Sequence, residues 1–314
     1  MRKAVLSIQH LLAMFGATVL VPLLTGLDPS VAIFCAGIGT LIFHKCTDLK
    51  VPVFLGSSFA FISVINQVKN TFNGDLSYAQ GGIMVAGLLY IIMSMIIKVA
   101  GPKKVKKYFP PQVTGAMIMI IGLNLLPTAV EMAMNNIIVA IVTLSIAVGI
   151  NKFGRGSIKQ FSVIIAIFIG IAVSAFIGIT DFSAVSKASL FAIPNFSAPK
   201  FSLKAIIIIA PVVLAVFMEH VGDITTNGAV VGKNFLEDPG LHKTLLGDGL
   251  ATLVAGLIGG PANTTYGENT ALLAITKNYD PKLLRLTAIF AILIACISKF
   301  GAFLQSIPTA VMGG

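Results

Sequence analysis

Four acidic side chains interrupt long apolar stretches of the sequence, where a carboxylate is costly to place. These are Glu219, Asp223, Asp248 and Glu268, whereas the other eight acidic residues lie between apolar stretches. A charge at the centre of a bilayer costs at least ~2.5 kcal/mol, so each is a functional candidate. Glu219 and Asp223 are four residues apart and share a helix face. Because two close carboxylates in a low dielectric do not both ionise easily, this pair favours a bound proton. We interpret Asp248, which lies between glycines, as a packing or capping group.

A second place for chemistry is the polar run at 263–269 (NTTYGEN), which contains Glu268. Hydrogen-bond donors and acceptors converge there, so a small planar polar ligand could bind a carboxylate and exposed backbone together. His220 follows Glu219 directly but points about 100° away around a helix. An interhelical hydrogen bond is its first interpretation and a proton relay is the alternative. His10, next to Gln9, is interpreted in the same way.

Other kinds of site are not indicated by the remaining reactive residues. The four histidines and three cysteines lack the spacing of metal ligands or of a disulfide framework. No nucleophile–base arrangement, phosphate loop or dinucleotide fingerprint occurs in the sequence. These observations argue against an enzyme or an ATP-driven pump, and we expect no metal and no cofactor. An ion channel would need a continuous polar pore, and no filter-like repeat is visible.

The elements that position these residues follow from composition. Of 314 residues, 56% are hydrophobic and 11% are charged, and the mean hydropathy is +0.94. Soluble domains carry about 25% charged residues, and apolar blocks of roughly 17–25 residues match the length of a membrane span. The net charge of +10 lies in short loops, which favours topology rather than nucleic-acid binding. We therefore predict an all-α polytopic membrane protein embedded in a lipid bilayer.

Eleven spans are predicted, and the first is interpreted as a span rather than a signal peptide because many similar blocks follow. A twelfth block starts at 308–314, so we interpret the chain as a fragment. With the N-terminus in the cytoplasm, 17 basic residues fall on the cytoplasmic side and 4 on the outside. The positive-inside rule therefore predicts a cytoplasmic N-terminus. The predicted spans are 5–26, 30–44, 51–68, 79–99, 112–127, 135–151, 161–180, 204–232, 244–260, 262–277 and 283–303.

A repeat is indicated by two short matches on either side of the polar connection at 181–204. Gln9-His10 and Phe59 are separated much as Glu219-His220 and Glu268 are, by 50 and 49 residues. Seven spans precede the connection, so a second copy would be inverted, as in many secondary transporters. Two short matches of this kind also arise by chance.

Two of the predicted spans, 51–68 and 262–277, are short and broken by proline and glycine. Broken spans at corresponding places in two halves point to a binding site at the membrane midplane. The alternation of side chains at 57–62 fits a short strand. The alternative interpretation is two short helices with glycines at packing contacts.

These motifs resemble the nucleobase–ascorbate transporter family, and within it the bacterial uracil permeases. The resemblance extends along the whole chain in the family's order. It rests on Gln9-His10 with 11–22 (LLAMFGATVLVP), 56–63 (GSSFAFIS), 219–222 (EHVG), 238–242 (DPGLH), 263–269 (NTTYGEN) and 308–314.

The resemblance implies a fold of fourteen spans in two inverted seven-span repeats, with a core and a gate domain and short strands in broken spans three and ten. About eleven spans are present here. Residues 1–110 would form the first core repeat, 111–203 part of the gate and the linker, and 204–306 the second core repeat. Residues 307–314 would begin span twelve. Homodimers through the gate are common in this family.

The resemblance also implies a nucleobase site between spans three and ten. Glu219 and Glu268 would accept hydrogen bonds from the nucleobase N–H groups, Tyr266 and Gly267 would offer backbone groups, and Phe59 would pack on the ring. The supporting residues expected around this site are Gln9, His10, Ser58 and Asn269. The residues expected to couple protons are Glu219, Asp223, Glu268 and His220.

Two departures from the family pattern bear on substrate and coupling. Uracil permeases have histidine where this chain has Asp223, whereas xanthine-type relatives often have aspartate there. Ala271 replaces a glycine of the family signature. Glu268 is nevertheless typical of uracil transporters, because purine-type members usually carry glutamine at that position. We therefore expect a proton-coupled uracil symporter of the cytoplasmic membrane. The alternatives are a xanthine or uric acid permease and, further removed, an anion transporter of related fold.

Overall fold

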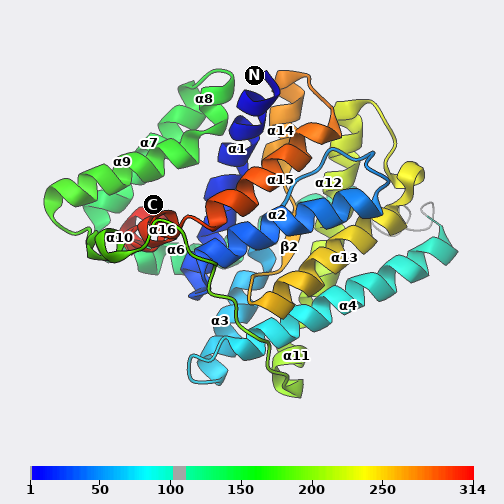
Figure 1. Cartoon of the computed structure of the whole chain (residues 1–314), viewed down its shortest axis with the longest axis horizontal. Helices are drawn as coiled ribbons and strands as arrows, with labels where there is room; N and C mark the ends of the chain where they lie inside the picture. Colours follow the sequence, from blue (N-terminus) through cyan, green and yellow to red (C-terminus); the bar gives the residue numbers. More distant parts are fainter. Residues whose placement is uncertain (1, 102–110) are drawn as a thin grey trace.

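The computed structural model describes residues 2–101 and 111–314, and these are almost entirely helical (Figure 1). Two three-residue strands, β1 (Leu55–Ser57) and β2 (Asn263–Thr265), form the sheet of the described chain. The longer helices are α1 (Arg2–Thr25), α2 (Pro29–Cys46), α3 (Ile62–Thr71), α4 (Ser77–Ala100), α6 (Pro111–Ala133), α7 (Ile137–Phe153), α9 (Ser162–Ile177), α12 (Val212–Val231), α13 (Leu241–Ile258), α14 (Gly267–Thr276) and α15 (Pro281–Ala295). The short helices are η1 (Phe59–Phe61), α8 (Ser157–Gln160), α10 (Ser183–Lys187), α11 (Leu203–Ile209), η2 (Leu236–Gly240), α16 (Ser298–Gln305) and α17 (Thr309–Gly313).

Membrane-spanning capacity is present in many of these helices. Five helical stretches in the described chain are long and apolar enough to cross a bilayer: α1, α2, α4, 203–231 and 236–258. The pair α15 and α16 passes the same test if counted as one span, and α7 and α9 are shorter apolar helices. The protein is thus a helical multi-pass membrane protein, as predicted. The span predicted at 283–303 corresponds to this pair, in which α15 and α16 meet at a bend of 82°.

Local sequence determines where several helices begin. Asp28 precedes α2 and accepts hydrogen bonds from the backbone N–H groups of Ser30 (2.7 Å) and Val31 (3.4 Å). Asp280 precedes α15 in the same way and accepts from the N–H of Lys282. In both places a proline follows the aspartate, where its missing N–H costs nothing. Asp-Pro therefore starts a span in each half of the chain.

The helices that support the broken spans pack unusually closely. Helices α2, α13 and α4 lie side by side, whereas α7, α8 and α9 lie on the opposite side of the molecule (Figure 1). A side chain at Gly87 of α4 would come within 2.5 Å of the Leu253 backbone of α13, and one at Gly249 within 2.8 Å of Tyr90. Small residues let helix backbones approach, which is how membrane helices gain packing energy.

The two broken spans cross through their strands. Strands β1 and β2 pair antiparallel, with Leu55 opposite Thr265 and Ser57 opposite Asn263. Each strand leads into a short helix, η1 with α3 after β1 and α14 after β2. Short strands in both broken spans were expected. The strand predicted at 57–62 is misplaced, because β1 ends at Ser57 and the chain turns helical from Phe59 onward.

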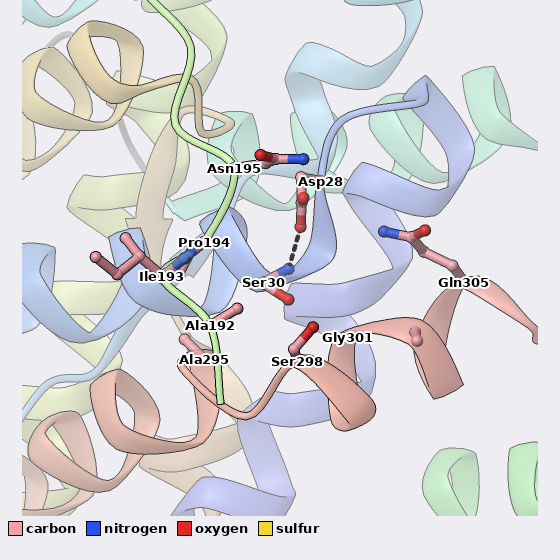
Figure 2. Close-up of a pocket in the computed structure, with 11 residues that line it drawn as sticks. Asp28, Ser30, Ala192, Ile193, Pro194, Asn195, Ala295, Ser298, Gly301 and Gln305 are labelled. Atoms are coloured by element: carbon pink, nitrogen blue, oxygen red, sulfur yellow. Dashed lines mark hydrogen bonds between the residues drawn. The ribbon is translucent and has the colours of Figure 1, made fainter. Parts of the chain in front are cut away.

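The connection between the two halves runs extended across helix ends. Its backbone pairs with the α15–α16 bend, from Ala192 N–H to the Cys296 carbonyl and from Ser298 N–H to the Leu190 carbonyl. A cavity of about 230 Å³ lies between this connection, the start of α2 and α16 (Figure 2). Asp28 borders the cavity, and Figure 2 shows its carboxylate turned back to cap α2 at Ser30. The cavity does not include any of the predicted site residues.

Candidate functional site

Short backbone ladders fix the place where the half-spans cross. Beyond the paired strands, Ser58 N–H donates to the Ala262 carbonyl (2.8 Å) and Tyr266 N–H donates to the Phe54 carbonyl (3.0 Å). Asn227 of α12 donates to the Pro52 carbonyl and to Thr270 Oγ1, both at 3.0 Å. Helix α12, which carries two of the candidate acids, is thereby tied to both half-spans.

Tyr266 is a structural wedge at this crossing. Its side chain is 4% exposed, and its hydroxyl donates to the Ser57 carbonyl at 3.0 Å. Thr18 of α1 donates to the Tyr266 hydroxyl (3.3 Å), and Ser57 Oγ donates to the Thr18 carbonyl (2.9 Å). The ring covers Gly56, where any side chain would come within 2.3 Å of it. The backbone N–H of Tyr266, one of the groups expected to meet a ligand, donates to the Phe54 carbonyl in this structure.

Gly267 and Glu268 lie at the first turn of α14 and are both exposed. A side chain at Gly267 would meet nothing within 4 Å, so open space lies beside this backbone. The Glu268 carboxylate accepts a hydrogen bond from its own backbone N–H. N–H groups in the first turn of a helix lack intrahelical partners and are available to a ligand. This end of α14 therefore offers an open, polar surface.

Glu219 and Asp223 lie on α12, which packs against α14. Both are half-buried, and Glu219 Oε2 is buried with no hydrogen-bond partner in the described chain. Asp223 accepts a hydrogen bond of 2.7 Å from the Thr265 hydroxyl on β2. Glu219 interacts electrostatically with Asp223, Asp248 and Glu268. The candidate acids are therefore close enough in space to influence one another's protonation.

The remaining expected residues surround the crossing in several ways. His10 is fully buried, and Asn269 donates to its carbonyl at 3.0 Å and lies 3.2 Å from its Nδ1. Ser58 is buried with its hydroxyl unpartnered among the described residues. Phe59 is half-buried at the start of η1, and Gln9 is half-buried on α1. Printed contacts thus link His10 to the first turn of α14 and Asp223 to β2, whereas Gln9 is placed only on α1 next to His10.

A second buried group adjoins the acids and involves residues that sequence patterns did not connect. His220 Nδ1 lies 3.1 Å from Asp248 Oδ2, and both side chains are completely buried. His220 Nε2 lies 3.0 Å from the Thr244 hydroxyl. Asp248 and Thr244 belong to α13, far from His220 in the sequence. Sequence spacing cannot reveal such a contact between helices. Thr265, which donates to Asp223, could have been found, because it lies inside the polar run at 263–269.

The chemistry that this arrangement supports is recognition of hydrogen-bond donors. In the described chain the ion pairs of Lys and Arg involve Asp48, Asp75, Asp238 and Asp280, and none involves Glu219, Asp223 or Glu268. No group of three His, Cys, Asp or Glu side chains in the described residues could hold a metal ion. Carboxylates accept hydrogen bonds from ligand N–H groups, and the free backbone N–H groups of a helix's first turn donate to ligand carbonyls.

The fold and the crossing of two broken spans define a class, that of multi-pass transporters with a binding site at discontinuous helices. The Xan_ur_permease model, described as "Permease family", matches residues 1–314. The chain belongs to this family of permeases.

Individual relatives agree with this placement, and solved structures share the fold. The chain is 42% identical to a protein named "Probable uracil permease" from Pasteurella multocida (strain Pm70), covering 100% of this chain and 77% of that protein. It is 40% identical to "Uracil permease" from Escherichia coli (strain K12), covering 98% and 74%. Its fold resembles the transmembrane domain of the cyanobacterium bicarbonate transporter BicA (TM-score 0.67, 14% identity, 99% and 86% covered). It also resembles SLC26A9 (TM-score 0.70, 9% identity, 99% and 56% covered).

Proposed function

We propose that this permease is a proton-coupled symporter that imports uracil across the bacterial cytoplasmic membrane. The observation that carries the proposal is the unpartnered Glu219 carboxyl oxygen close to Glu268 and to the open backbone at Gly267. Relatives named uracil permease, at about 40% identity along the chain, support the substrate class.

Uracil suits these groups chemically. It presents N–H donors next to carbonyl acceptors, so Glu219 and Glu268 accept from the N–H groups while backbone N–H of the first turn of α14 donates to a carbonyl. Phe59 packs on the ring from the first half-span. A site built to hydrogen-bond such groups rejects analogues that lack them by large factors.

Proton coupling follows from the concentration of acid in this part of the protein. Glu219, Asp223, Asp248 and Glu268 act on one another without a lysine or arginine ion pair in the described chain. Such groups cannot all be ionised in a low dielectric, so protons bind together with the substrate. Asp223 and His220 take part in this coupling.

Transport itself requires a movement, which we propose occurs between two domains. Residues 1–110 and 204–306 form the core, which carries the crossing half-spans, and 111–203 with 307–314 contribute to the gate; of these, 1 and 102–110 lie outside the residues that the structure describes. The core moves against the gate and exposes the site to either side. The N-terminus lies in the cytoplasm, and homodimers form through the gate.

Two observations favour other substrates, a purine base or an anion. Asp223, where uracil-type relatives have histidine, favours a xanthine or uric acid permease. The fold likeness to a bicarbonate transporter raises an anion as a substrate. An anionic substrate is disfavoured because the site contains three carboxylates and no basic partner among the described residues.

The test is uptake of radiolabelled uracil by the full-length protein in cells that lack their own uracil permease. We expect uptake that collapses with a protonophore and that excess xanthine does not inhibit. Inhibition by xanthine would contradict uracil specificity, and uptake insensitive to the protonophore would contradict proton coupling. Absence of uptake, with the protein shown to be in the membrane, would contradict the uracil proposal and favour the anion transporter.

A further inference from the structure

The helix of the first half-span, α3, has two unlike faces. Its buried face is apolar, is completely covered by the core, and consists of Ile62, Ile65 and Val68. Its open face is polar, and its members recur at spacings of three and four residues, which places them along one side of a helix. These polar residues are Ser63, Asn66, Gln67 and Asn70.

The polar face of α3 lines a groove of about 490 Å³ against α6, which we call the α3–α6 groove. Thr128 of α6 lies on its other wall. Asn124 and Glu131 are exposed and share a helix face with Thr128, because they are four residues before it and three after it. Both walls of the groove therefore present polar side chains.

Most of the polar groups in the groove have no partner in the protein. The side chains of Ser63, Gln67 and Asn70 are exposed and make no hydrogen bond within the described chain. Asn66 uses its amide N–H toward the Leu24 carbonyl, at 3.4 Å. Polar groups without partners are costly in hydrocarbon and are tolerated where they line a cavity that contains water. The lining of the groove thus suits water and a polar ligand rather than lipid.

The α3–α6 groove leads from the candidate site toward one end of the molecule. Phe59, which is expected to pack on the ligand ring, lies one turn before Ser63. Near the other end of α3, Lys69 donates to the Thr25 carbonyl at 3.1 Å, and Thr25 is the last residue of α1. Figure 1 shows α3 on the side of the molecule remote from the N-terminus. The groove therefore connects the candidate site with the side opposite the N-terminus.

The corresponding helix of the second half-span differs. Within α14, the exposed side chains that follow Glu268 are Ala271, Ala274 and Ile275. These three side chains are apolar and offer no hydrogen bond. Among the described residues of the two half-span helices, a polar approach to the site thus runs along α3 and not along α14.

The amides of Gln67 and Asn70 determine what the groove can hold. A side-chain amide presents a carbonyl acceptor next to an N–H donor. It therefore forms two parallel hydrogen bonds with a ring edge that presents N–H beside C=O, as asparagine and glutamine do with the edges of bases. Because these amides carry no charge and face water, they bind less tightly than buried carboxylates, which suits capture followed by release.

We propose that the α3–α6 groove is a docking subsite, in which Gln67 and Asn70 hold a planar molecule with adjacent N–H and C=O groups before it reaches Phe59. That this molecule is uracil rests on the proposed function. The subsite adds selection for the hydrogen-bonding edge of the base before the carboxylates are reached.

The first test asks whether the groove contains water. Ser63→Cys and Gln67→Cys are made in the full-length protein, placed in lipid nanodiscs that expose both membrane faces, and treated with a charged, membrane-impermeant thiol reagent. We expect both to react. Ile65→Cys, on the buried face of α3, should react no faster than the wild type with its three cysteines. Absence of reaction at both groove positions would overturn the subsite. This measurement needs neither uracil nor transport, so it is independent of the proposed function.

The second test asks whether uracil occupies the groove. Uracil is added during labelling of Ser63→Cys, and the concentration that halves the reaction rate is measured. Gln67→Leu and Asn70→Leu, each combined with Ser63→Cys, should raise that concentration about 2- to 12-fold, the factor that one hydrogen bond contributes. Asn151→Leu, which removes an exposed amide of α7, is the matched control and should leave it unchanged. The compound 1,3-dimethyluracil, which has no N–H group, should protect more weakly than uracil.

A further variant separates docking from binding at the carboxylates. Glu268→Gln, combined with Ser63→Cys, is expected to weaken the carboxylate site, so protection that comes from the groove keeps its half-protecting concentration. Protection that weakens in Glu268→Gln but ignores Gln67→Leu and Asn70→Leu would refute the docking subsite, as would absence of protection. Absence of uracil uptake by the wild type, with protection of Ser63→Cys intact, would instead count against the proposed function.

Discussion

The two broken half-spans share a backbone plan but differ in chemistry. Each consists of an extended segment, a three-residue strand and a helix of ten residues, α3 or α14. The first half-span is closed: Gly56 is covered by the Tyr266 ring, and Ser57 and Ser58 are fully buried. The second is open: Gly267 adjoins free space, and Glu268 is exposed. The difference indicates that the first half-span supplies shape and the second supplies polar recognition.

The largest effect is expected from removing the charge of the open half-span. Glu268→Gln keeps the size of the side chain but replaces the carboxylate that we propose accepts ligand N–H groups. A hydrogen bond to a charged group contributes about 1.5–3 kcal/mol, so we expect uracil binding to weaken about 10- to 150-fold. Binding is measured by titration of the purified protein. Glu237→Gln, at an exposed position of η2, is the matched control and should bind as the wild type does. Unchanged affinity in Glu268→Gln would remove this residue from the site.

A pair of glycine substitutions tests the contrast between closed and open half-spans. Gly56→Ala places a methyl group against the Tyr266 ring and should destabilise the protein by about 1–3 kcal/mol. Gly267→Ala fills open space and should leave the Tm unchanged. Thermal unfolding in detergent compares the two variants with the wild type. Equal losses of Tm in both would show that the half-spans do not differ in packing as described.

The link between the second strand and α12 is tested at Asp223. Asp223→Asn removes an ionisable group that Thr265 holds at 2.7 Å, and we expect a changed pH dependence of uptake with affinity altered less. Thr265→Val is the companion variant, because it removes the donor but keeps the carboxylate. It should also change the pH dependence of uptake, since the carboxylate loses its hydrogen bond to Thr265. An unaltered pH profile in Asp223→Asn would place this residue outside the coupling route.

The loops that follow the two half-spans are fastened in parallel ways. Asp75, after α3, accepts from Lys200 at 2.9 Å, and Asp280, after α14, accepts from Lys3 at 3.1 Å. The hydrogen bond from Lys200, followed by those from the side chain and the backbone N–H of Ser77, lowers the pKa of Asp75 to about 2. The pKa of Asp280 is lowered mainly by a hydrogen bond from the backbone N–H of the residue two positions after it, and to a smaller extent by Lys3.

The smallest effect is expected from these loop contacts. A carboxylate with a lowered pKa stabilises the fold above its unfolded pKa of about 4 and loses that contribution as the pH falls toward its folded pKa. Asp75→Asn should therefore lower the Tm at pH 7 by only about 1 °C, because exposed ion pairs contribute little. The difference from the wild type should vanish as the pH approaches 2. A difference that grows on acidification would contradict the assigned pKa.

Much of the fold was predictable because bilayer thickness constrains sequence directly. Long apolar blocks mark α1, α2, α4 and α13, and proline and glycine mark the broken spans at 51–68 and 262–277. The bend between α15 and α16 was not predictable, since the residues at 283–303 are apolar enough for one straight span and the bend depends on tertiary packing. The strand was placed too late because alternation at 57–62 fits both a strand and the buried side of η1.

The candidate site was predictable where rare charges stand out against an apolar background. Glu219 and Glu268 are recognisable for that reason. The contacts of Asp248 and the use of the Tyr266 N–H by Phe54 depend on which helices and strands become neighbours. Neither has a local sequence pattern. What the sequence could not specify is thus the division of labour between groups that bind ligand and groups that hold the binding residues.

We propose that carboxylates of α12 and α14 accept the N–H groups of uracil. The most direct measurement is equilibrium binding of radiolabelled uracil to the full-length protein, with unlabelled uracil, 1-methyluracil and 3-methyluracil as competitors. Each methyl group removes one N–H donor, so we predict that both methylated compounds compete at least about 10-fold more weakly than uracil. Competition by both compounds as strong as that of uracil would contradict recognition by the carboxylates and, with it, the proposed site.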